Sequence, residues 1–298
     1  YVIGPRINAG GRVGKSEHGS NLLLNADPQV SYKIATDLDD YNKERQLLEK
    51  KLLENVIKKI KDFTDPVLVL SGENWHEGVI GIVASRIKEK FNKPTIIISI
   101  DKDISKASAR SIVGFDIGSV IINGVQNNLL IKGGGHKMAG GFSIETDKID
   151  DFKQFVIKKF KIQNIDTSVS KRILIDSVIT PSAINLEFFD KLNNLAPFGS
   201  GNPEPRFFIE GLKSVNSKIV GEKHIKSVLL GKDGTTIKTM AFNAVESDIG
   251  AYLLDKRVKP FNIVGKLTLN EWKGVKNVEF IIDDISVNKT HEVTVPSS

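Results

Sequence analysis

Residues 66–100, PVLVLSGENWHEGVIGIVASRIKEKFNKPTIIISI, set the architecture of the first half of the chain. The run 66–71 is apolar and is bounded by Pro and by Ser-Gly, which is typical of a buried strand. Apolar residues then recur at helical spacing over 77–91, and 94–100 is a second apolar run. Strand, helix and strand in this order indicate a βαβ unit with parallel strands and a right-handed crossover. We therefore expect an α/β domain here.

Further elements are expected on both sides of this unit. Apolar periodicity predicts one long helix at 31–61, which ends before Pro66 because the residue preceding a proline avoids the helical region. Its many lysines and arginines fit either a solvated face or a nucleic-acid track. Residues 1–15, YVIGPRINAGGRVGK, are rich in glycine and are expected to form a loop or a short broken segment. Beyond the βαβ unit we expect, in chain order, a strand at 105–112, a helix at 116–125 with Asp116 as N-cap, a strand at 141–145 and a helix at 149–161.

The second half of the chain has a different pattern. The polar segment 161–171, KIQNIDTSVSK, predicts a linker. After it, short β-like runs recur with one helix at 182–194, and strands at this spacing predict a small barrel or sandwich, with an OB-like barrel fitting their number. The runs are 173–178, 206–210, 214–220, 225–230, 235–242, 261–269 and 275–285.

Length and composition limit the class of protein. With 298 residues, 40% of them hydrophobic and 26% charged, the chain fits a globular protein of about two domains. No apolar run approaches the roughly 20 residues that cross a membrane. The net charge of +6 is compatible with a polyanionic partner or with general lysine richness. The absence of cysteine excludes disulfides and thiolate zinc sites and favours a cytoplasmic location. Because the chain begins with Tyr1, we expect that a further segment precedes it.

The motif GGGHKMAGG, Gly133 to Gly141, is the strongest candidate for chemistry. Successive glycines can adopt positive φ and direct several backbone N–H groups at one point, which forms an anion-binding nest. His136 adds a hydrogen-bond donor or an acid–base group at the same place. The alternative is a flexible turn, but the second glycine pair directly precedes a predicted strand. We therefore expect a loop that holds a phosphate.

Three other segments carry arginine or histidine near small residues. In ENWHEGVIGIVASR, His76 precedes a helix N-terminus, where it either caps the helix or contributes to an anion site. In SKASARS, Ser108 and Arg110 offer a guanidinium flanked by hydroxyls, which suits phosphate or a surface salt bridge. GPRINAGGR resembles a phosphate-contacting loop through Arg6, Asn8 and Arg12. The sequence contains no cluster with metal-ligand spacing, no P-loop and no nucleophile elbow.

These four segments, in this order, resemble the RecJ family of single-stranded-DNA-specific exonucleases within the DHH phosphoesterase superfamily. GPRINAGGR is similar to the loop that closes the catalytic domain of that family, and NWHEGVIGIVASRI, KASARS and GGGHKMAGG are similar to its DHH-associated domain. APFGSGNPEPRF, residues 196–207, resembles the entry to its OB domain. The resemblance extends from Tyr1 to about Val287. The GGGH motif is shared across the superfamily, whereas the first and last segments are more specific.

The resemblance implies a domain order and a cofactor. It implies an α/β DHH-associated domain with a mixed sheet, a long connecting helix on its N-terminal side and an OB-like barrel that follows. The implied ranges are 1–30 for the end of the DHH catalytic domain, 31–63 for the connecting helix, 64–162 for the DHH-associated domain, 163–171 for the linker and 172–298 for the barrel. The family uses Mn²⁺ or Mg²⁺ bound by motifs that would precede Tyr1. We thus expect no metal ligand in this chain, which would be an excerpt or the product of a split gene.

The resemblance also implies roles for individual residues. His136 would act in catalysis by contacting the scissile phosphate or the attacking water, and the backbone of Gly133, Gly134 and Gly135 would hold phosphate oxygens. Ser108 and Arg110 would position the DNA strand. Arg6, Asn8 and Arg12 would line the entry, and His76 would contact DNA or support the site. Candidate base-stacking residues of the barrel, which are alternatively core residues, are Phe198, Phe207, Phe208 and Trp272.

Three hypotheses follow for the function. The leading one is the C-terminal part of a metal-dependent 5′→3′ single-stranded-DNA exonuclease of recombination and repair, with single-strand-binding protein or a helicase as further partners. The second is a module that binds single strands without catalysis when it lacks the DHH half. The third is a DHH-family phosphodiesterase that acts on short oligonucleotides, although the barrel predicted after residue 172 favours a longer substrate.

Overall fold

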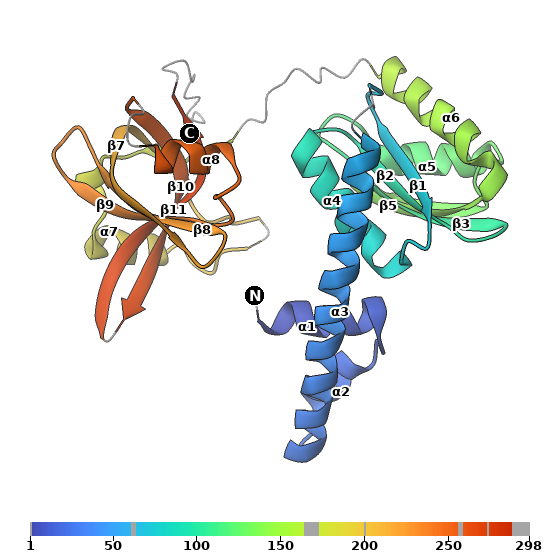
Figure 1. Cartoon of the computed structure of the whole chain (residues 1–298), viewed down its shortest axis with the longest axis horizontal. Coiled ribbons are helices and arrows are strands. Elements are labelled where there is room, and N and C mark those ends of the chain that lie inside the picture. Colours follow the sequence, from blue (N-terminus) through green and yellow to red (C-terminus); the bar gives the residue numbers. More distant parts are fainter. Residues whose placement is uncertain are drawn as a thin grey trace. The chain divides into compact units, whose positions relative to one another are not determined.

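The computed structural model divides into two compact units, Tyr1–Lys171 and Arg172–Ser298 (Figure 1). Most of the predicted linker and the side chain of Trp272, predicted as a stacking residue, lie outside the described part of the chain. The structure describes residues 2–60, 64–163, 173–199, 201–255, 259–272 and 274–287.

The first unit is built on a five-stranded mixed sheet with the strand order β1-β2-β3-β5-β4. β1 and β2 are parallel, and all other pairs are antiparallel. Helix α4 (Glu77–Phe91) connects β1 to β2, so the predicted βαβ unit is confirmed. The strands are β1 (Leu68–Glu73), β2 (Thr95–Ile100), β3 (Ile104–Arg110), β4 (Lys132–His136) and β5 (Ala139–Glu145).

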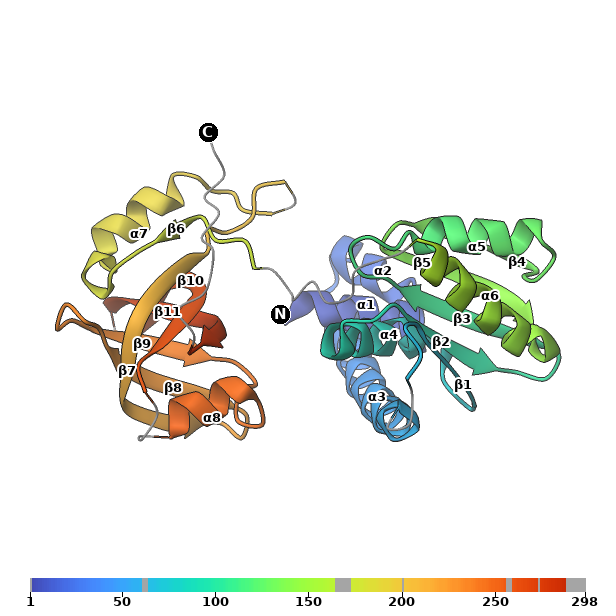
Figure 2. The same cartoon turned by 90° about the horizontal axis from the view of Figure 1, so that it is seen from above.

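Helices cover both faces of this sheet (Figure 2). On one face, α5 (Ile117–Gln126) and α6 (Ile149–Ile162) bury a core that includes Ile121 and Phe152. On the other face, α4 and α3 (Pro28–Ile60) pack on the β1 and β2 side of the sheet. The predicted N-cap of α5 is confirmed, since the Asp116 carboxylate accepts a hydrogen bond from the Ser119 amide at 3.0 Å.

The prediction of a loop or a short broken segment over residues 1–15 is wrong, because most of these residues form helix α1 (Ile3–Val13). With α2 (His18–Leu24), it packs along α3. A Cβ at Gly10 would lie 2.7 Å from the Lys15 carbonyl oxygen, so glycine permits a close backbone contact there. Packing against α3 thus outweighs the low helix propensity of glycine. Helix α3 itself begins earlier than predicted, because the Asp27 carboxylate accepts from the Gln29 amide at 2.8 Å and caps it.

The second unit is a closed five-stranded barrel in the order β7-β8-β9-β11-β10, with β10 pairing back onto β7. β9 and β11 pair in parallel, and the other neighbours in the barrel are antiparallel. This topology confirms the predicted OB-like barrel. Its elements are β6 (Ser177–Val178), α7 (Leu186–Asn193), β7 (Phe207–Val220), β8 (His224–Leu230), β9 (Thr236–Ala241), α8 (Asp248–Leu254), β10 (Phe261–Trp272) and β11 (Val275–Ser286).

Several boundaries in the barrel differ from prediction. The runs 206–210 and 214–220 form one strand, β7, which is irregular between Ser214 and Asn216. The predicted helix at 182–194 starts later, because Asn185 caps α7 through the Phe188 amide. Helix α8 was not predicted, and Ser247 caps it. Of the predicted strand 173–178 only the last two residues pair.

A candidate phosphate-binding site

Strand register places the polar residues of three strands on one face of the first sheet. Directly opposed residues share a face, and side chains alternate along each strand. Ser108 lies opposite Gly141, and Gly141 lies opposite Gly134. Two glycines therefore form a floor without side chains beside Ser108. The neighbouring rows of the same face hold Lys106, Ser143 and Lys132 on one side and Arg110, Ala139 and His136 on the other.

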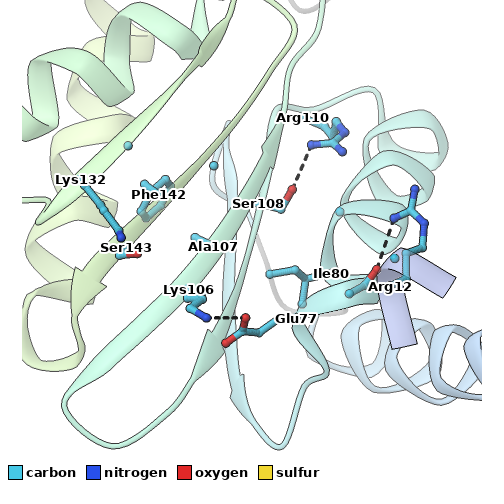
Figure 3. A pocket seen from close by; sticks show the side chains of 15 residues that line it. Arg12, Glu77, Ile80, Lys106, Ala107, Ser108, Arg110, Lys132, Phe142 and Ser143 are labelled. Carbon is cyan, nitrogen blue, oxygen red and sulfur yellow. Dashed lines mark hydrogen bonds and ion pairs between the residues drawn. The ribbon is translucent and has the colours of Figure 1, made fainter. Parts of the chain in front are cut away.

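A cavity of about 670 Å³ opens over this face (Figure 3). Its wall combines the end of α1 with the first turns of α4 and with strands β3, β4 and β5. The polar side chains that line it are Arg12, Glu77, Lys106, Ser108, Arg110, Lys132 and Ser143. Its cations outnumber its single carboxylate, so the cavity suits an anion.

Arg110 is held in a fixed orientation at this cavity. Its Nε donates to Ser85 Oγ at 3.1 Å, and its Nη1 donates to Ser108 Oγ at 3.0 Å (Figure 3). Nη1 also donates to the Ala109 carbonyl at 2.8 Å. These contacts occupy the Nε and Nη1 donors, and no Nη2 contact is found within the described part of the chain. Ser108 therefore orients a guanidinium that still has donors for a ligand.

Two guanidinium groups share this site. Burial, and secondly the nearby charge of Arg12, lower the pKa of Arg110 below its ordinary value. Arginine nevertheless remains protonated in proteins, so the lowered pKa reflects the cost of burying this charge, with a smaller contribution from the repulsion by Arg12, and not a neutral group. Among the residues that the structure describes, neither Arg12 nor Arg110 forms an ion pair with a carboxylate. A bound phosphate would supply the missing countercharge.

Arg12 reaches the cavity because α1 packs closely on α4. Its Nη1 donates to the Gly78 carbonyl at 3.3 Å, and its backbone fills the space that a Cβ at Gly78 would need. One turn later, a Cβ at Gly81 would lie 3.0 Å from Arg110 Nη2 and from Ser108 Oγ. The missing side chains of Gly78 and Gly81 on α4 thus leave room for both arginines.

The glycine motif does not form the predicted loop or nest. Gly133, Gly134 and Gly135 belong to β4, and none has a positive φ. A Cβ at Gly133 would meet Phe142 Cβ at 2.6 Å and Ile121 Cγ2 at 2.7 Å, so α5 packing requires glycine there. At Gly134, which faces the opposite side, a Cβ would meet nothing within 4 Å. Close packing against α5 and β5 therefore explains Gly133, and the close approach of β5 explains Gly135, whereas no positive-φ nest is formed.

His136 is exposed at the end of β4 and lies on the same sheet face as Ser108 and Arg110, although it does not line the cavity itself. Its Nδ1 accepts a hydrogen bond from the Met138 amide at 3.3 Å. In the neutral ring the proton is therefore on Nε2, which can donate to a ligand. The adjoining turn is fixed because Ser111 N donates to Met138 O at 2.8 Å and Ile117 N to Lys137 O at 3.3 Å.

Three predicted site residues lie elsewhere. Arg6 forms an ion pair with Asp39 at 2.8 Å and so ties α1 to α3. Asn8 is exposed on α1 and is not part of the cavity wall. His76 caps α4, since its Nδ1 accepts from the Gly78 amide at 3.1 Å, which supports the capping alternative for this residue.

Sequence reasoning missed three charged residues of the cavity, Glu77, Lys106 and Lys132. Lys106 and Glu77 form an ion pair of 2.7 Å at its edge. Lys106 could have been found from the alternation of side chains along a strand, because Lys106, Ser108 and Arg110 are spaced by two residues on one strand.

The site residues do not fit a divalent metal. No group of three or more His, Cys, Asp or Glu side chains that could hold a metal ion is found over the described ranges. The cavity is instead lined by arginine and lysine, which repel a cation. The same part of the chain contains no helix that is long and apolar enough to span a membrane.

The predicted stacking residues of the barrel are mostly in its core. Phe207 and Phe208 are buried, which supports the alternative that they are core residues. Phe198 is half-buried in the segment before β7.

Comparison with known proteins defines the class of both units. Residues 64–162 match the DHHA1 domain, and residues 175–284 match the RecJ OB domain. The chain therefore joins a DHH-associated domain to an OB-fold domain. This combination, together with the relatives below, places the chain in the RecJ family, of which it represents the DHHA1 and OB portion.

The relatives align with nearly the whole chain. A single-stranded-DNA-specific exonuclease RecJ of Haemophilus influenzae is 30% identical over 96% of this chain and 51% of its own length. RecJ of Bacillus subtilis is 28% identical over 97% of this chain and 37% of its own length. The crystal structure of RecJ from Thermus thermophilus in complex with Mn²⁺ has a TM-score of 0.78 at 28% identity, covering 97% of this chain and 41% of that one. The chain thus spans about half or less of the length of these relatives.

Proposed function

We propose that this chain is the C-terminal part of a RecJ-type 5′→3′ single-stranded-DNA exonuclease and that its α/β cavity holds a backbone phosphate of the substrate. In this proposal, residues 1–30 close the catalytic domain, and residues 31–63 form the helix that connects it to the phosphate-binding domain at 64–162. A linker at 163–171 follows, and residues 172–298 bind the single strand. We place its action in DNA recombination and repair in the cytoplasm, with single-strand-binding protein or a helicase as recruiting partners.

One observation carries the phosphate assignment. Arg12 and Arg110 line one cavity without a carboxylate partner in the described part of the chain, and Ser108 fixes the orientation of Arg110 at 3.0 Å. Arginine presents paired donors that match two phosphate oxygens. Below the arginines, Gly134 and Gly141 leave the sheet without side chains, so a phosphodiester backbone can approach β4 and β5 closely.

His136 is positioned to act on the same phosphate. It lies in the row of Arg110 on the same sheet face, and its Nε2 is free to donate once Nδ1 accepts from Met138. A donor there would stabilise negative charge that develops on a phosphate oxygen in the transition state. We therefore assign His136 to catalysis, and Arg12 and Arg110 to binding and orientation.

The metal ions belong to the part of the enzyme outside this chain in our proposal. RecJ of Thermus thermophilus has been crystallised with Mn²⁺ and with Mg²⁺. Because the cavity is cationic, we assign it to the substrate phosphate and expect the Mn²⁺ or Mg²⁺ ligands on the DHH half. We expect the isolated chain to bind single strands without cleaving them.

A reconstitution experiment tests this function. The DHH half of a RecJ relative is joined to this chain, and 5′-labelled and 3′-labelled single strands are incubated with Mn²⁺. We expect degradation of single strands from the 5′ end and none of blunt duplex. Absence of cleavage when the grafted half is folded, or equal cleavage of duplex, would contradict the proposal.

The role of His136 is tested in the same reconstituted enzyme. His136→Ala should lower the single-turnover cleavage rate by about 100-fold, in the range for one lost donor to a developing oxyanion. The Kd for a single strand should change less than threefold, because one exposed contact contributes little to ground-state binding. Equal losses of rate and affinity would argue against a catalytic role.

A further inference from the structure

The N–H donors of Arg110 divide into those bound within the protein and those left for a ligand. Its Nε donates to Ser85 Oγ at 3.1 Å. Its Nη1 hydrogens go to Ser108 Oγ at 3.0 Å and to the Ala109 carbonyl oxygen at 2.8 Å (Figure 3). The Nη2 hydrogens remain, and no acceptor for them is found within the described ranges. The protein therefore presents Arg110 to the cavity through Nη2, which lies close to Gly81.

The two serine hydroxyls that accept from Arg110 differ in where their own hydrogens go. Ser85 lies on α4, and its Oγ donates to the Gly81 carbonyl oxygen at 3.1 Å, so its hydrogen is used inside the helix. Ser108 lines the cavity, and its Oγ donates to no acceptor in the described part of the chain, so it can contact a ligand itself. Ser85 does not line the cavity. Any effect of Ser85 on the ligand must therefore pass through Arg110.

The turn of α4 that carries Ser85 is anchored to α3. The next residue, Arg86, forms an ion pair with Oε1 of Glu49 on α3. Oε2 of the same carboxylate accepts from Arg45 at 2.6 Å. Glu49 is only 4% exposed, so its charge requires these two guanidinium partners. The anchored turn holds the Ser85 hydroxyl in place beside Arg110.

We propose that Ser85 is a positioning residue of the phosphate site. By accepting from Nε it fixes the plane of the Arg110 guanidinium, so that Nη2 faces the phosphate that Arg12 also contacts. This inference rests on the proposed function and adds a residue that never touches the ligand. A guanidinium that is fixed beforehand loses less side-chain freedom on binding, which raises affinity. Ser108 secures Nη1, and Ser85 secures the other end of the group.

Matched substitutions separate this role from a structural one. Ser85→Ala removes the acceptor, and α4 should keep its stability because alanine has the highest helix propensity. Ser85→Thr keeps a hydroxyl that can donate to the carbonyl oxygen four residues earlier and still accept from Arg110. Ser20→Ala is the control on α2, because Ser20 Oγ also donates to a backbone carbonyl oxygen, that of Glu17 at 2.9 Å, and does not line the cavity.

Binding of a labelled oligothymidylate to the full chain, followed by fluorescence anisotropy, measures the effect on the site. Ser85→Ala should weaken binding about 3- to 10-fold, in the range for one hydrogen bond. Ser85→Thr should bind like the parent, and so should Ser20→Ala. In an Arg110→Gln background, Ser85→Ala should cause no further loss, because residues that act through one another are not additive. Equal losses with and without Arg110 would overturn the inference.

The orientation of the guanidinium is measured by the Nε–H resonance of Arg110 in proton–nitrogen NMR spectra. Its absence in Arg110→Gln assigns the resonance. In the parent the hydrogen bond to Ser85 should protect this hydrogen from exchange with water. The protection should be lost in Ser85→Ala and kept in Ser85→Thr. An unchanged exchange rate in the Ala variant would show that Ser85 does not hold Nε.

The outcomes distinguish this inference from the function on which it rests. If Arg110→Gln weakens binding while Ser85→Ala binds like the parent, the phosphate site stands and the positioning role is overturned. If Arg110→Gln itself binds like the parent, the phosphate assignment and the role of Ser85 both fail. None of these results concerns cleavage, so the proposed nuclease function would still be judged by the reconstitution experiment.

Discussion

Arg12 Nη1 donates to the carbonyl oxygen of Gly78 across 3.3 Å, and the Arg12 backbone occupies the place of the missing Gly78 side chain. This contact joins α1 to α4 and brings Arg12 into the cavity that contains Arg110. The position of one binding residue thus depends on a glycine 66 positions away in sequence.

Gly78→Ala should separate α1 from α4. We expect a loss of about 1–3 kcal/mol in the free energy of unfolding, the usual cost of overpacking, together with weaker binding of single strands. Urea unfolding followed by Trp75 fluorescence in a Trp272→Phe background measures the first effect, and anisotropy measures the second. Gly4→Ala is the control, because a Cβ there meets nothing within 4 Å. A Gly78→Ala variant as stable as the control would contradict the packing account.

Gly133→Ala and Gly134→Ala should separate stability from binding. A Cβ at Gly133 would lie within 2.7 Å of Phe142 and Ile121, so this variant should unfold more easily by about 1–3 kcal/mol. A Cβ at Gly134 has open space, and Gly134 lies opposite Gly141, which lines the cavity. Gly134→Ala should keep its stability and bind single strands more weakly. The reverse pattern in urea unfolding and anisotropy would show that the binding face of β4 has been misassigned.

Asp116 should link pH to stability at the start of α5. The hydrogen bond from the Ser119 backbone amide is the largest of the causes that lower the pKa of Asp116. Its carboxylate therefore stabilises the fold fully above the unfolded value of about 3.9, and this stabilisation is lost as the pH falls through the depressed folded pKa.

Two variants at this position separate charge from capping. Asp116→Ala should lose about 0.5–2 kcal/mol at pH 7, whereas Asp116→Asn keeps an acceptor and should lose less. In urea unfolding, the difference in the free energy of unfolding between the parent and the Asp116→Asn variant should shrink from pH 7 to pH 3. A difference that stays constant over this range would exclude the charge effect.

Elements that depend on local sequence could be predicted, whereas elements that depend on contacts distant in the chain could not. The runs at 66–71 and 94–100 form strands that are buried on both faces, and a continuous apolar run is the sequence pattern of such strands. The helix over Gly10 and Gly11 was missed because its stabilising partners are on α3, far along the chain. Strand β4 was missed for a similar reason, since its glycines are explained by close contacts with Ile121 on α5 and with the facing strand β5.

The candidate site was predictable by residue type more than by geometry. Arg12, Ser108 and Arg110 were chosen because guanidinium and hydroxyl groups suit phosphate, and the structure brings them to one cavity. Arg6 has the same chemistry, but its pairing with Asp39 depends on how α1 lies on α3. Lys132 carries no local signal, and only the register of β4 with β5 places it on the cavity face.

The salt dependence of single-strand binding by an arginine variant tests the central claim most directly. Arg12→Gln/Arg110→Gln removes both guanidinium groups and keeps polar side chains, while Arg6→Gln removes one guanidinium outside the cavity. With a labelled oligothymidylate, the logarithm of the association constant falls as the logarithm of the salt concentration rises. We predict that the double variant makes this negative slope shallower by about 1.4 and that the control leaves it unchanged. An unchanged slope and affinity in a folded double variant would contradict the assignment of this cavity to a DNA phosphate.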